Sequence, residues 1–314
     1  MTTIKKINKT NIKKAVERLK NGELVSFPTE TVYGLGADAS NELAIAKIFE
    51  SKKRPKFNPL IIHFSSFDEI KENCETNNII EELNQLFWPG PLTIVLKRKK
   101  TSNLSSLASA GLNTLAVRIP DNNIALKLID NLKKPIAAPS ANKSGLLSPT
   151  EASHVYNYFR NDKNLSIILD GGPTIIGVES TVVKIDNGKI YILRHGGISL
   201  EELEDKTSYK IFDNEKKNDK HIISPGMLSQ HYSPSVPLRI NVKKANEGEL
   251  LIGFGPEFSE PNLSKKGDLT EAASKLFSML SKLEKETERI AIAPIPNKGL
   301  GRAINDRINR ASND

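Results

Sequence analysis

A strand pattern stops abruptly in residues 26–39, SFPTETVYGLGADA, and gives way to hydroxyl side chains, a carboxylate and glycine. Residues 24–27 predict a short buried strand, and Pro28 ends it because proline cannot donate a hydrogen bond to a neighbouring strand. Gly34 and Gly36 then allow another group to approach the backbone closely. Polar groups at the carboxyl end of a strand are typical of a ligand cleft in an α/β sheet. An ordinary turn that contains glycine is the alternative interpretation.

Apolar periodicity predicts that helices and strands alternate along the chain, which favours an α/β fold. The first helix is expected to start at Thr10, as its N-cap, and to end at residues 21–22. The second is expected to start at Ser40 or Asn41 and to end before Pro55. Further elements are expected as strands at 60–64, 92–96, 115–119 and 165–169, helices at 79–87 and 124–132, and a hairpin that turns at Asn187-Gly188.

The composition is that of a globular protein with more than one domain. The 314 residues are 38% apolar and 26% charged, and no apolar run is long enough to span a membrane. The basic N-terminus has no apolar block behind it, so we expect a cytoplasmic protein. Cys74 is the single cysteine, which excludes a disulfide framework and a cysteine-rich zinc site. The net charge of +8 fits a nucleic acid, a phosphate-bearing small substrate or a lysine-rich surface.

The composition changes once near residue 206 and again near residue 236, which predicts two domains joined by a linker. Residues 206–236 begin polar and charged and continue with closely spaced proline and glycine. Beyond them we expect a small β-α-β-α unit, with strands at 250–254 and 290–295, a helix capped by Thr270 and a last helix at 299–311. The predicted units are a first domain at 1–205, the linker at 206–236 and a second domain at 237–314.

Several charged or polar residues lie where a ligand could use them, and each has a plainer interpretation. Lys52 and Arg54 end the second predicted helix, where cations also complement the helix dipole. His63 lies in an apolar strand, where a hydrogen-bonded core histidine is more common than a catalytic one. Arg118 lies in another apolar strand and needs a structural ion pair or an anionic ligand. Residues 135–150 are rich in hydrogen-bond donors and form either an anion cradle or a long loop that caps the next helix.

The order of several short motifs resembles the YrdC-like family. The matching segments are FPTETVYGLGADA at 27–39, Lys52-x-Arg54-Pro55 with Asn58-Pro59-Leu60 and His63, WPGPLT at 88–93, VRIP at 117–120, PSAN at 139–142, GVEST at 177–181 and LRHG at 193–196. The segments SPGM at 224–227, HYSP at 231–234 and GLGRAINDRINRA at 299–311 resemble the two-domain form of this family. The resemblance covers nearly the whole chain. Lys53 departs from it, because the family often has glycine at this position.

The resemblance implies a twisted, open mixed sheet with surrounding helices and a positively charged cleft, joined to a small Rossmann-like α/β domain. It implies a nucleotidyltransferase that condenses L-threonine, bicarbonate or CO2, and ATP to L-threonylcarbamoyladenylate and pyrophosphate, with Mg²⁺ carried by the phosphates. The product serves threonylcarbamoyladenosine formation at position 37 of tRNAs that read codons beginning with A, and a separate transferase completes that step. Weak RNA binding is a further expectation, and a membrane partner is not expected.

The resemblance also assigns roles to residues of this chain. Lys52 and Arg54 would bind the triphosphate and stabilise charge in the reaction, and we expect both to be accessible to solvent. The remaining residues are expected to surround L-threonine (Thr31, His63, Arg118, Ser140 and Ser180) or to contact ATP (Arg54, Asn58, Thr114, Asn142, Thr150, Arg194 and, as a lid, Tyr232). His231 is expected to lie beside Tyr232.

Two other functions fit part of the pattern. A carbamoyltransferase of the hydrogenase-maturation kind shares the Lys-x-Arg and Ser-x-Asn elements and also forms an acyl-adenylate, but such proteins carry cysteine-rich modules. A factor that binds double-stranded RNA could use a basic concave surface against the phosphate backbone. Hydroxyl and amide side chains among the cations favour a pocket for a small ligand over a surface that follows a nucleic-acid backbone.

Overall fold

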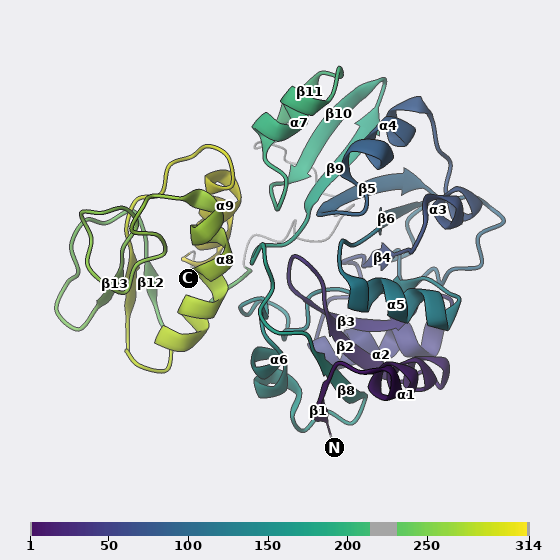
Figure 1. Ribbon diagram of the computed structural model, residues 1–314, viewed down its shortest axis with the longest axis horizontal. Helices are drawn as coiled ribbons and strands as arrows, with labels where there is room; N and C mark the ends of the chain where they lie inside the picture. The colour runs from purple at the N-terminus through teal and green to yellow at the C-terminus, as the bar shows by residue number, and fades with distance from the viewer. Residues whose placement is uncertain (1, 214–230, 313–314) are drawn as a thin grey trace.

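An 11-stranded mixed sheet forms the larger part of the protein (Figure 1). The structure is a computed structural model and describes residues 2–213 and 231–312. The strands follow one another across the sheet in the order β1-β8-β2-β3-β7-β4-β6-β5-β9-β10-β11. Their bounds are β1 (Thr3–Lys6), β2 (Leu24–Pro28), β3 (Tyr33–Asp38), β4 (Ile61–His63), β5 (Leu92–Lys97), β6 (Thr114–Arg118), β7 (Ile136–Ala137), β8 (Leu165–Asp170), β9 (Thr181–Asp186), β10 (Lys189–Arg194) and β11 (Ile211–Asp213).

Asparagine side chains mark the start of several helices that surround this sheet. Asn8 accepts a hydrogen bond from the backbone N–H of Asn11, so the first helix begins before Thr10 and the expected Thr10 cap is wrong. Asn41 caps the second helix, as the sequence predicts. The helices of this part are α1 (Lys9–Lys20), α2 (Glu42–Lys52), α3 (Phe67–Asn73), α4 (Asn78–Phe87), α5 (Asn123–Leu132), α6 (Ala152–Phe159) and α7 (Leu200–Lys206).

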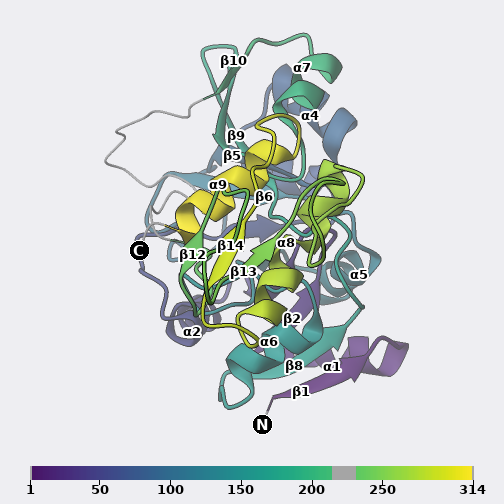
Figure 2. The same ribbon diagram turned by 90° about the vertical axis from the view of Figure 1, so that its left-hand side faces the viewer.

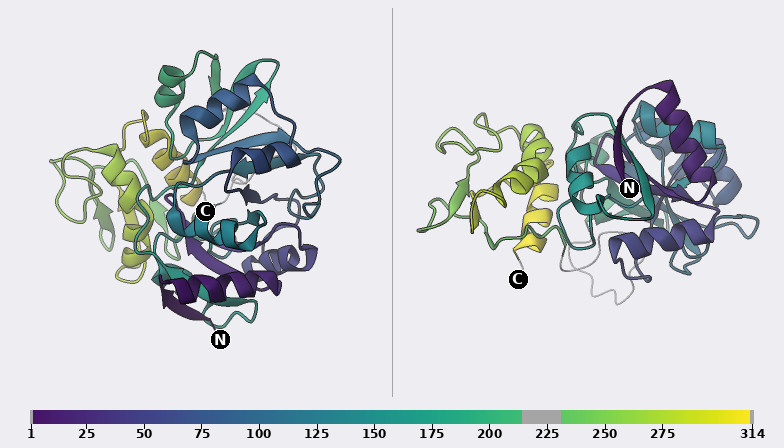
Figure 3. Two further views of the ribbon diagram at one scale, coloured as in Figure 1. Left: turned by 45° about the vertical axis from the view of Figure 1, so that its right-hand side comes forward. Right: turned by 90° about the horizontal axis from the view of Figure 1, so that it is seen from below.

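The central strands are buried on both faces because helices cover each side. Successive residues of a strand point to opposite faces, and Ile167 and Ile168 of β8 accordingly enter different apolar cores. Ile167 packs in the core that contains residues of α1 and α5, whereas Ile168 packs in the core that contains residues of α2, α4 and α6. The twisted mixed sheet with helices on both faces agrees with the fold predicted from the sequence (Figure 3).

A second, three-stranded parallel sheet forms the C-terminal part, in the order β12-β14-β13 (Figure 2). Its elements are β12 (Leu238–Arg239), β13 (Leu250–Ile252), α8 (Leu269–Leu283), β14 (Ile290–Ile292) and α9 (Gly301–Ala311). The expected β-α-β-α unit is present, with β12 as an additional strand. Asp268 caps α8 by accepting a hydrogen bond from the backbone N–H of Glu271, so the expected cap at Thr270 is wrong.

Helices α8 and α9 lie between the two sheets and face the larger part of the protein (Figures 1 and 3). Gly177 has φ +78°, and a Cβ atom there would lie 2.5 Å from the carbonyl oxygen of Ala273 in α8. This contact requires glycine for both its backbone conformation and its lack of a side chain. Val178 and Leu147 of the larger part also belong to the apolar core of the C-terminal part. The two parts are therefore packed closely where residues 177–178 cross α8.

The predicted linker is described only in part. Its motif Ser224-Pro225-Gly226-Met227 lies outside the described residues. At its beginning, β11 pairs in parallel with β10, and at its end His231 and Tyr232 are buried. No helix within 2–213 or 231–312 is both long and apolar enough to cross a membrane. The predicted domain limits at 205 and 237 stay predictions.

Candidate functional site

Segments that are far apart in the sequence enclose one small cavity. Its volume is about 50 Å³, which is room for a few water molecules. The predicted residues in its wall are Thr31, Arg54, His63, Arg118, Ser140, Ser180, Arg194 and Tyr232, joined by Thr29, Glu179 and His231 among others. These come from the β2–β3 connection, the ends of β4, β6 and β10, and the loops after α2 and β7 and before β9. The fold thus brings together most of the side chains that the sequence predicts for a ligand site.

Lys52 lies behind the cavity wall and holds two backbone segments together. It is the last residue of α2 and is 1% exposed, so the expectation that it is accessible to solvent is wrong. Its Nζ donates hydrogen bonds to the carbonyl oxygens of Ser140 and Asn142, each at 2.6 Å. Burial, and then the charges of Arg54 and Lys143, lower the pKa of Lys52 well below its usual value.

Arg54 is a buried cation in the cavity wall and is likewise not freely accessible, since only 8% of its surface is exposed. Its Nε donates to the carbonyl oxygen of Asn58 at 3.1 Å, and its Nη2 donates to that of Pro59 at 2.8 Å. Within the described ranges, no carboxylate forms an ion pair with Arg54. Burial and the charge of Arg194 lower the pKa of Arg54 to about 9. A buried guanidinium with this arrangement is stabilised by an anionic ligand.

Asn58 supplies an unsatisfied polar group near Arg54. Its side chain is fully buried, and neither its amide nitrogen nor its amide oxygen forms a hydrogen bond within the described residues. Buried amides in proteins are nearly always hydrogen-bonded, and exceptions occur where a ligand or water completes the site. Asn58 itself is not in the cavity wall as the structure shows it.

Arg118 and His63 lie side by side on neighbouring strands, in register between β6 and β4. Arg118 Nη2 lies 2.5 Å from Glu30 Oε1 in a buried ion pair. The geometry of this contact is not that of a hydrogen bond. Its Nη1 donates to Thr31 Oγ1 at 3.1 Å, and its Nε donates to the carbonyl oxygen of Gly90 at 3.2 Å. The structural ion pair considered for Arg118 is therefore present, and the same guanidinium also faces the cavity.

His63 is neutral in this environment. Burial and the positive charge of Arg118 lower the pKa of His63 to about 3. Its Nδ1 is buried and has no hydrogen-bond partner within the described part of the chain. A neutral imidazole with a free ring nitrogen at the cavity can take part in a hydrogen bond with a polar ligand group.

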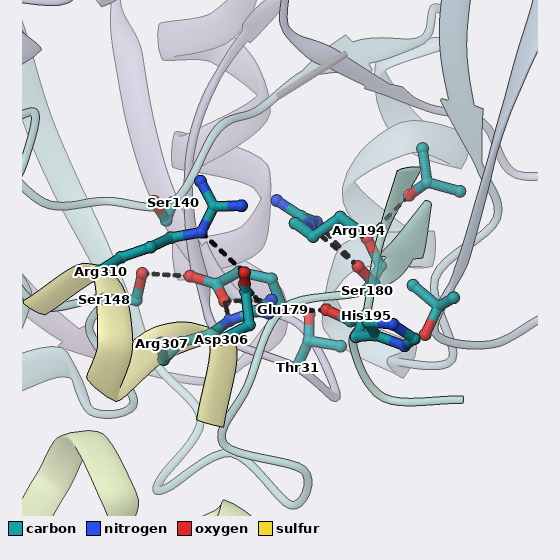
Figure 4. A network of polar contacts seen from close by, with 12 residues as sticks. Thr31, Ser140, Ser148, Glu179, Ser180, Arg194, His195, Asp306, Arg307 and Arg310 are labelled. Carbon is teal, nitrogen blue, oxygen red and sulfur yellow. Dashed lines mark hydrogen bonds and ion pairs between the residues drawn. The ribbon is translucent and has the colours of Figure 1, made fainter. Parts of the chain in front are cut away.

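Ser180 and Arg194 form the opposite wall (Figure 4). Arg194 donates to the carbonyl oxygen of Ser180 through Nε at 3.1 Å and through Nη2 at 2.8 Å. The Ser180 hydroxyl lies 3.1 Å from Arg194 Nη2 and 2.8 Å from the Thr93 hydroxyl. Burial is the main cause of the lowered pKa of Arg194. The strand order β5-β9-β10 places these three residues together.

Glu179 is a cavity residue to which the sequence assigns no role. Its carboxylate accepts hydrogen bonds from the Ser148 hydroxyl at 2.5 Å and from Arg307 Nε at 3.0 Å. Burial raises the pKa of Glu179, but the charges of Arg307 and Arg194 outweigh it and lower the value to about 2. Glu179 directly precedes the predicted ligand-binding residue Ser180 in the GVEST motif, and this position could have indicated that it lies at the site. Arg307 of α9 lies in the segment GLGRAINDRINRA at 299–311, to which the resemblance assigned no residue role.

The buried end of the predicted linker fills the remaining side of the cavity. Tyr232 is 1% exposed, and its ring lies 4.0 Å from that of His231 and 5.6 Å from that of Phe277 in α8. Burial is the main cause that lowers the pKa of His231 to about 3. The cavity is too small for a nucleotide while both aromatic side chains occupy this position.

The other residues that were predicted to contact ATP do not reach the cavity wall in the described structure. Asn142 is fully buried behind Ser140 and accepts a hydrogen bond from the Ser140 hydroxyl at 2.5 Å. Thr150 is 2% exposed and precedes α6. Thr114 begins β6, at the opposite end of the strand from Arg118. Their predicted contacts with ATP stay predictions.

The fold and the site define an α/β protein with a buried, guanidinium-rich site for a small anionic ligand. Residues 17–196 match a family model of the Sua5, YciO and YrdC proteins, described as "Telomere recombination". Residues 198–313 match a family model described as "Threonylcarbamoyl-AMP synthase, C-terminal domain".

Similar proteins match almost the whole chain. A threonylcarbamoyl-AMP synthase of Pyrococcus abyssi is 39% identical over 98% of this chain and 95% of its own length. One of Bacillus subtilis is 36% identical over 97% of this chain and 94% of its own. A crystal structure of P. abyssi Sua5 complexed with L-threonine has a TM-score of 0.88 at 37% identity, with 99% of this chain and 97% of that chain covered. The chain belongs to the threonylcarbamoyl-AMP synthases, a family of enzymes.

Proposed function

We propose that this enzyme condenses L-threonine, bicarbonate or CO2, and ATP to L-threonylcarbamoyladenylate and pyrophosphate. The observation that carries the proposal is the convergence of Arg54, Arg118 and Arg194 on one buried cavity. The anionic groups that enter this reaction include the threonine carboxylate and the triphosphate. Buried guanidinium groups suit both, because their planar forks match carboxylate and phosphate oxygens. The L-threonine complex of the P. abyssi relative supports a threonine site in the corresponding fold.

Arg118 and its neighbours would bind L-threonine. Arg118 faces the cavity between Thr31 and His63, so its guanidinium can take the carboxylate of the amino acid. Ser140 and Ser180 lie across the cavity and offer hydroxyl groups to the amine and the side chain. The amine must lose a proton before it attacks CO2. A neutral His63 avoids repulsion of the ammonium group as it enters the site.

Lys52 and Arg54 would hold the triphosphate while the carbamate oxygen attacks the α-phosphorus and pyrophosphate leaves. In such a reaction the protein mainly positions reactants and neutralises charge. Arg54 does this directly from the wall, and Lys52 does it through the loop that it fixes. The remaining proposed ATP contacts are Asn58, Thr114, Asn142, Thr150, Arg194 and Tyr232. ATP enters as its magnesium complex, with the ion held by phosphate oxygens.

Entry of ATP requires that the segment with His231 and Tyr232 moves away. The cavity of about 50 Å³ accommodates no nucleotide beside these rings. We therefore propose that this segment acts as a lid, as the sequence suggests for Tyr232, and that it closes again over the bound nucleotide. Closure excludes water, which protects the reactive carbamate and strengthens the charge interactions.

The product would supply the threonylcarbamoyl group for adenosine 37 of tRNAs that read codons beginning with A. A separate transferase would accept the adenylate, and weak RNA binding by this enzyme would assist the transfer. The proposal places the protein in the cytoplasm, where ATP, L-threonine and tRNA occur together.

The two alternatives fit the structure less well. A factor that binds double-stranded RNA needs accessible cations along a surface, whereas Lys52 and Arg54 are buried. Two relatives that match 97–98% of the chain are threonylcarbamoyl-AMP synthases, which favours the synthase over a hydrogenase-maturation carbamoyltransferase.

Release of pyrophosphate tests the proposal. The purified enzyme is incubated with ATP, L-threonine and bicarbonate, and then with each of them omitted in turn. We expect threonylcarbamoyladenylate and pyrophosphate only when all three are present. Pyrophosphate release that does not depend on L-threonine, or none at all, would refute the synthase activity.

A further inference from the structure

The C-terminal helix α9 brings Arg307 to the surroundings of the cavity, beside Asp306 and Arg310 of the same helix (Figure 4). Its side chain is 1% exposed, although the helix belongs to the smaller part of the protein. Arg307 Nε and Nη2 each lie 3.0 Å from Glu179 Oε2, and Nη1 donates to the carbonyl oxygen of His195 at 2.6 Å. The ring of Tyr232 lies 5.2 Å from the centre of the Arg307 guanidinium. Arg307 thus contacts Glu179, the loop after β10 and the proposed lid, and its Nη1 also donates to Asp306 Oδ2 of the same helix at 2.8 Å.

Glu179 is the acidic group that makes this contact important. Its carboxylate lines the cavity together with Arg54 and Arg194, the cations to which the proposed function assigns the phosphates. An unpaired buried carboxylate at this place repels phosphate and competes with it for guanidinium groups. In the structure the Glu179 carboxylate is instead held by Arg307 on one oxygen and by the Ser148 hydroxyl on the other.

We propose that Arg307 is a positioning residue for the nucleotide site: it binds and neutralises the Glu179 carboxylate and so reduces the repulsion of the triphosphate by this carboxylate. This inference rests on the proposed function. The C-terminal part would then have a role in nucleotide binding, because Arg307 of α9 supplies the positive charge that pairs with Glu179 of the larger part. The effect falls on the nucleotide rather than on L-threonine, since Arg118 is paired with a different carboxylate, that of Glu30.

A second explanation is that Arg307 merely docks α9 against the larger part. The two explanations differ in what the removal of Glu179 does when Arg307 is already absent. If charge is decisive, Glu179→Gln removes the repulsion and restores nucleotide binding. If docking is decisive, the second substitution does not replace the lost contact between α9 and the larger part, and it restores nothing. A double-mutant cycle therefore separates them.

The experiment compares Arg307→Met, Arg307→Lys, Glu179→Gln and the double variant Arg307→Met/Glu179→Gln in the full-length chain. Arg302→Met is the matched control, because Arg302 also lies on α9 and pairs with Glu201 across the two parts at 3.1 Å, but outside the cavity wall. Calorimetry measures the affinity for the magnesium complex of ATP and for L-threonine separately. Circular dichroism and a thermal melt show that each variant is folded.

We expect Arg307→Met to raise the Kd for ATP roughly tenfold or more, with a smaller change for L-threonine. Arg307→Lys should recover part of the affinity, and the double variant should bind ATP nearly as well as Glu179→Gln alone. Arg302→Met should bind like the wild type. If Arg307→Met does not fold, the comparison of Arg307→Lys with Arg307→Lys/Glu179→Gln replaces it, with a smaller recovery expected because lysine keeps the positive charge.

Three results would overturn the inference: unchanged ATP affinity in Arg307→Met, equal losses for ATP and L-threonine, or a double variant as weak as Arg307→Met. None of these depends on turnover. A wild-type enzyme that binds ATP but releases no pyrophosphate with L-threonine and bicarbonate would instead refute the proposed synthase activity. The two failures are thus told apart.

Discussion

The ammonium group of Lys52 lies 2.6 Å from the carbonyl oxygen of Ser140, and it binds the carbonyl oxygen of Asn142 at the same distance. The Lys-x-Arg and Ser-x-Asn motifs, which are far apart in the sequence, are therefore one structural unit. Lys52 fixes the backbone of the loop that carries the Ser140 hydroxyl to the cavity. Arg54, two residues later, reaches the cavity itself.

Lys52→Met should abolish turnover and also destabilise the protein. The substitution keeps the aliphatic stem but leaves the carbonyl oxygens of Ser140 and Asn142 without their donor, which costs about 2 kcal/mol. Urea denaturation measures the stability, and pyrophosphate release measures the turnover. Lys56→Met is the control, because Lys56 is exposed in the same connection. A Lys52→Met protein with wild-type stability would contradict the structural role of the ammonium group.

Lys53→Gly should stabilise the protein without loss of activity. Lys53 is the C-cap of α2 and has φ +51°, a left-handed conformation that glycine adopts without strain. The resemblance that places glycine here thus has a physical reason. The gain is roughly 0.5 kcal/mol, since the greater freedom of glycine in the unfolded chain offsets part of it. Lys133→Gly, at the C-cap of α5 with φ +60°, should give a similar gain in urea denaturation. A loss of stability in both variants would contradict this explanation.

Tyr232→Ala should weaken the binding of ATP more than that of L-threonine. Tyr232 fills the side of the cavity where a nucleotide must enter, and it packs on Phe277 and Arg307. Tyr232→Phe, which retains the ring, should stay close to the wild type. Calorimetric titrations with each ligand measure the two affinities. Equal losses for both ligands would argue against a lid over the nucleotide.

His63→Gln should flatten the loss of stability in acid. The pKa of His63 is about 3 in the folded protein, below its ordinary value of 6.5. Between these values the unfolded chain binds a proton that the folded protein does not, so stability falls as the pH falls from 6.5 toward 3. The slope is up to about 1.4 kcal/mol per pH unit for one group, and His231 adds a slope of the same sign. Urea denaturation between pH 6.5 and pH 4 measures it. Identical slopes in wild type and variant would refute the buried neutral state of His63.

Local sequence patterns predict much of the fold because they report turn chemistry and apolar faces directly. The turn at Asn187-Gly188 is an example, since both residues have positive φ (+49° and +72°) and join antiparallel strands. The strand β1 was not predicted, because its residues are all exposed and show no apolar alternation. It exists by pairing with β8, a contact between residues about 160 positions apart that no local window contains.

Some residues of the candidate site could likewise be predicted from the sequence, and others could not. Motifs identified Arg54, Arg118 and Arg194 as residues for ligands, and the fold places all three at one cavity. They did not reveal that Lys52 is buried, because burial depends on how the loop at 139–142 folds over α2. The ion pair between Glu179 and Arg307 spans 128 positions and joins the two parts of the protein, so its partners became apparent only in three dimensions.

A crystal structure with L-threonine and a non-hydrolysable ATP analogue tests the central claim most directly. We predict both ligands in the one cavity, with the threonine carboxylate on Arg118, the phosphates on Arg54 and Arg194, and the segment of Tyr232 displaced or closed over the nucleotide. Binding of either ligand at a surface away from these three guanidinium groups would contradict it.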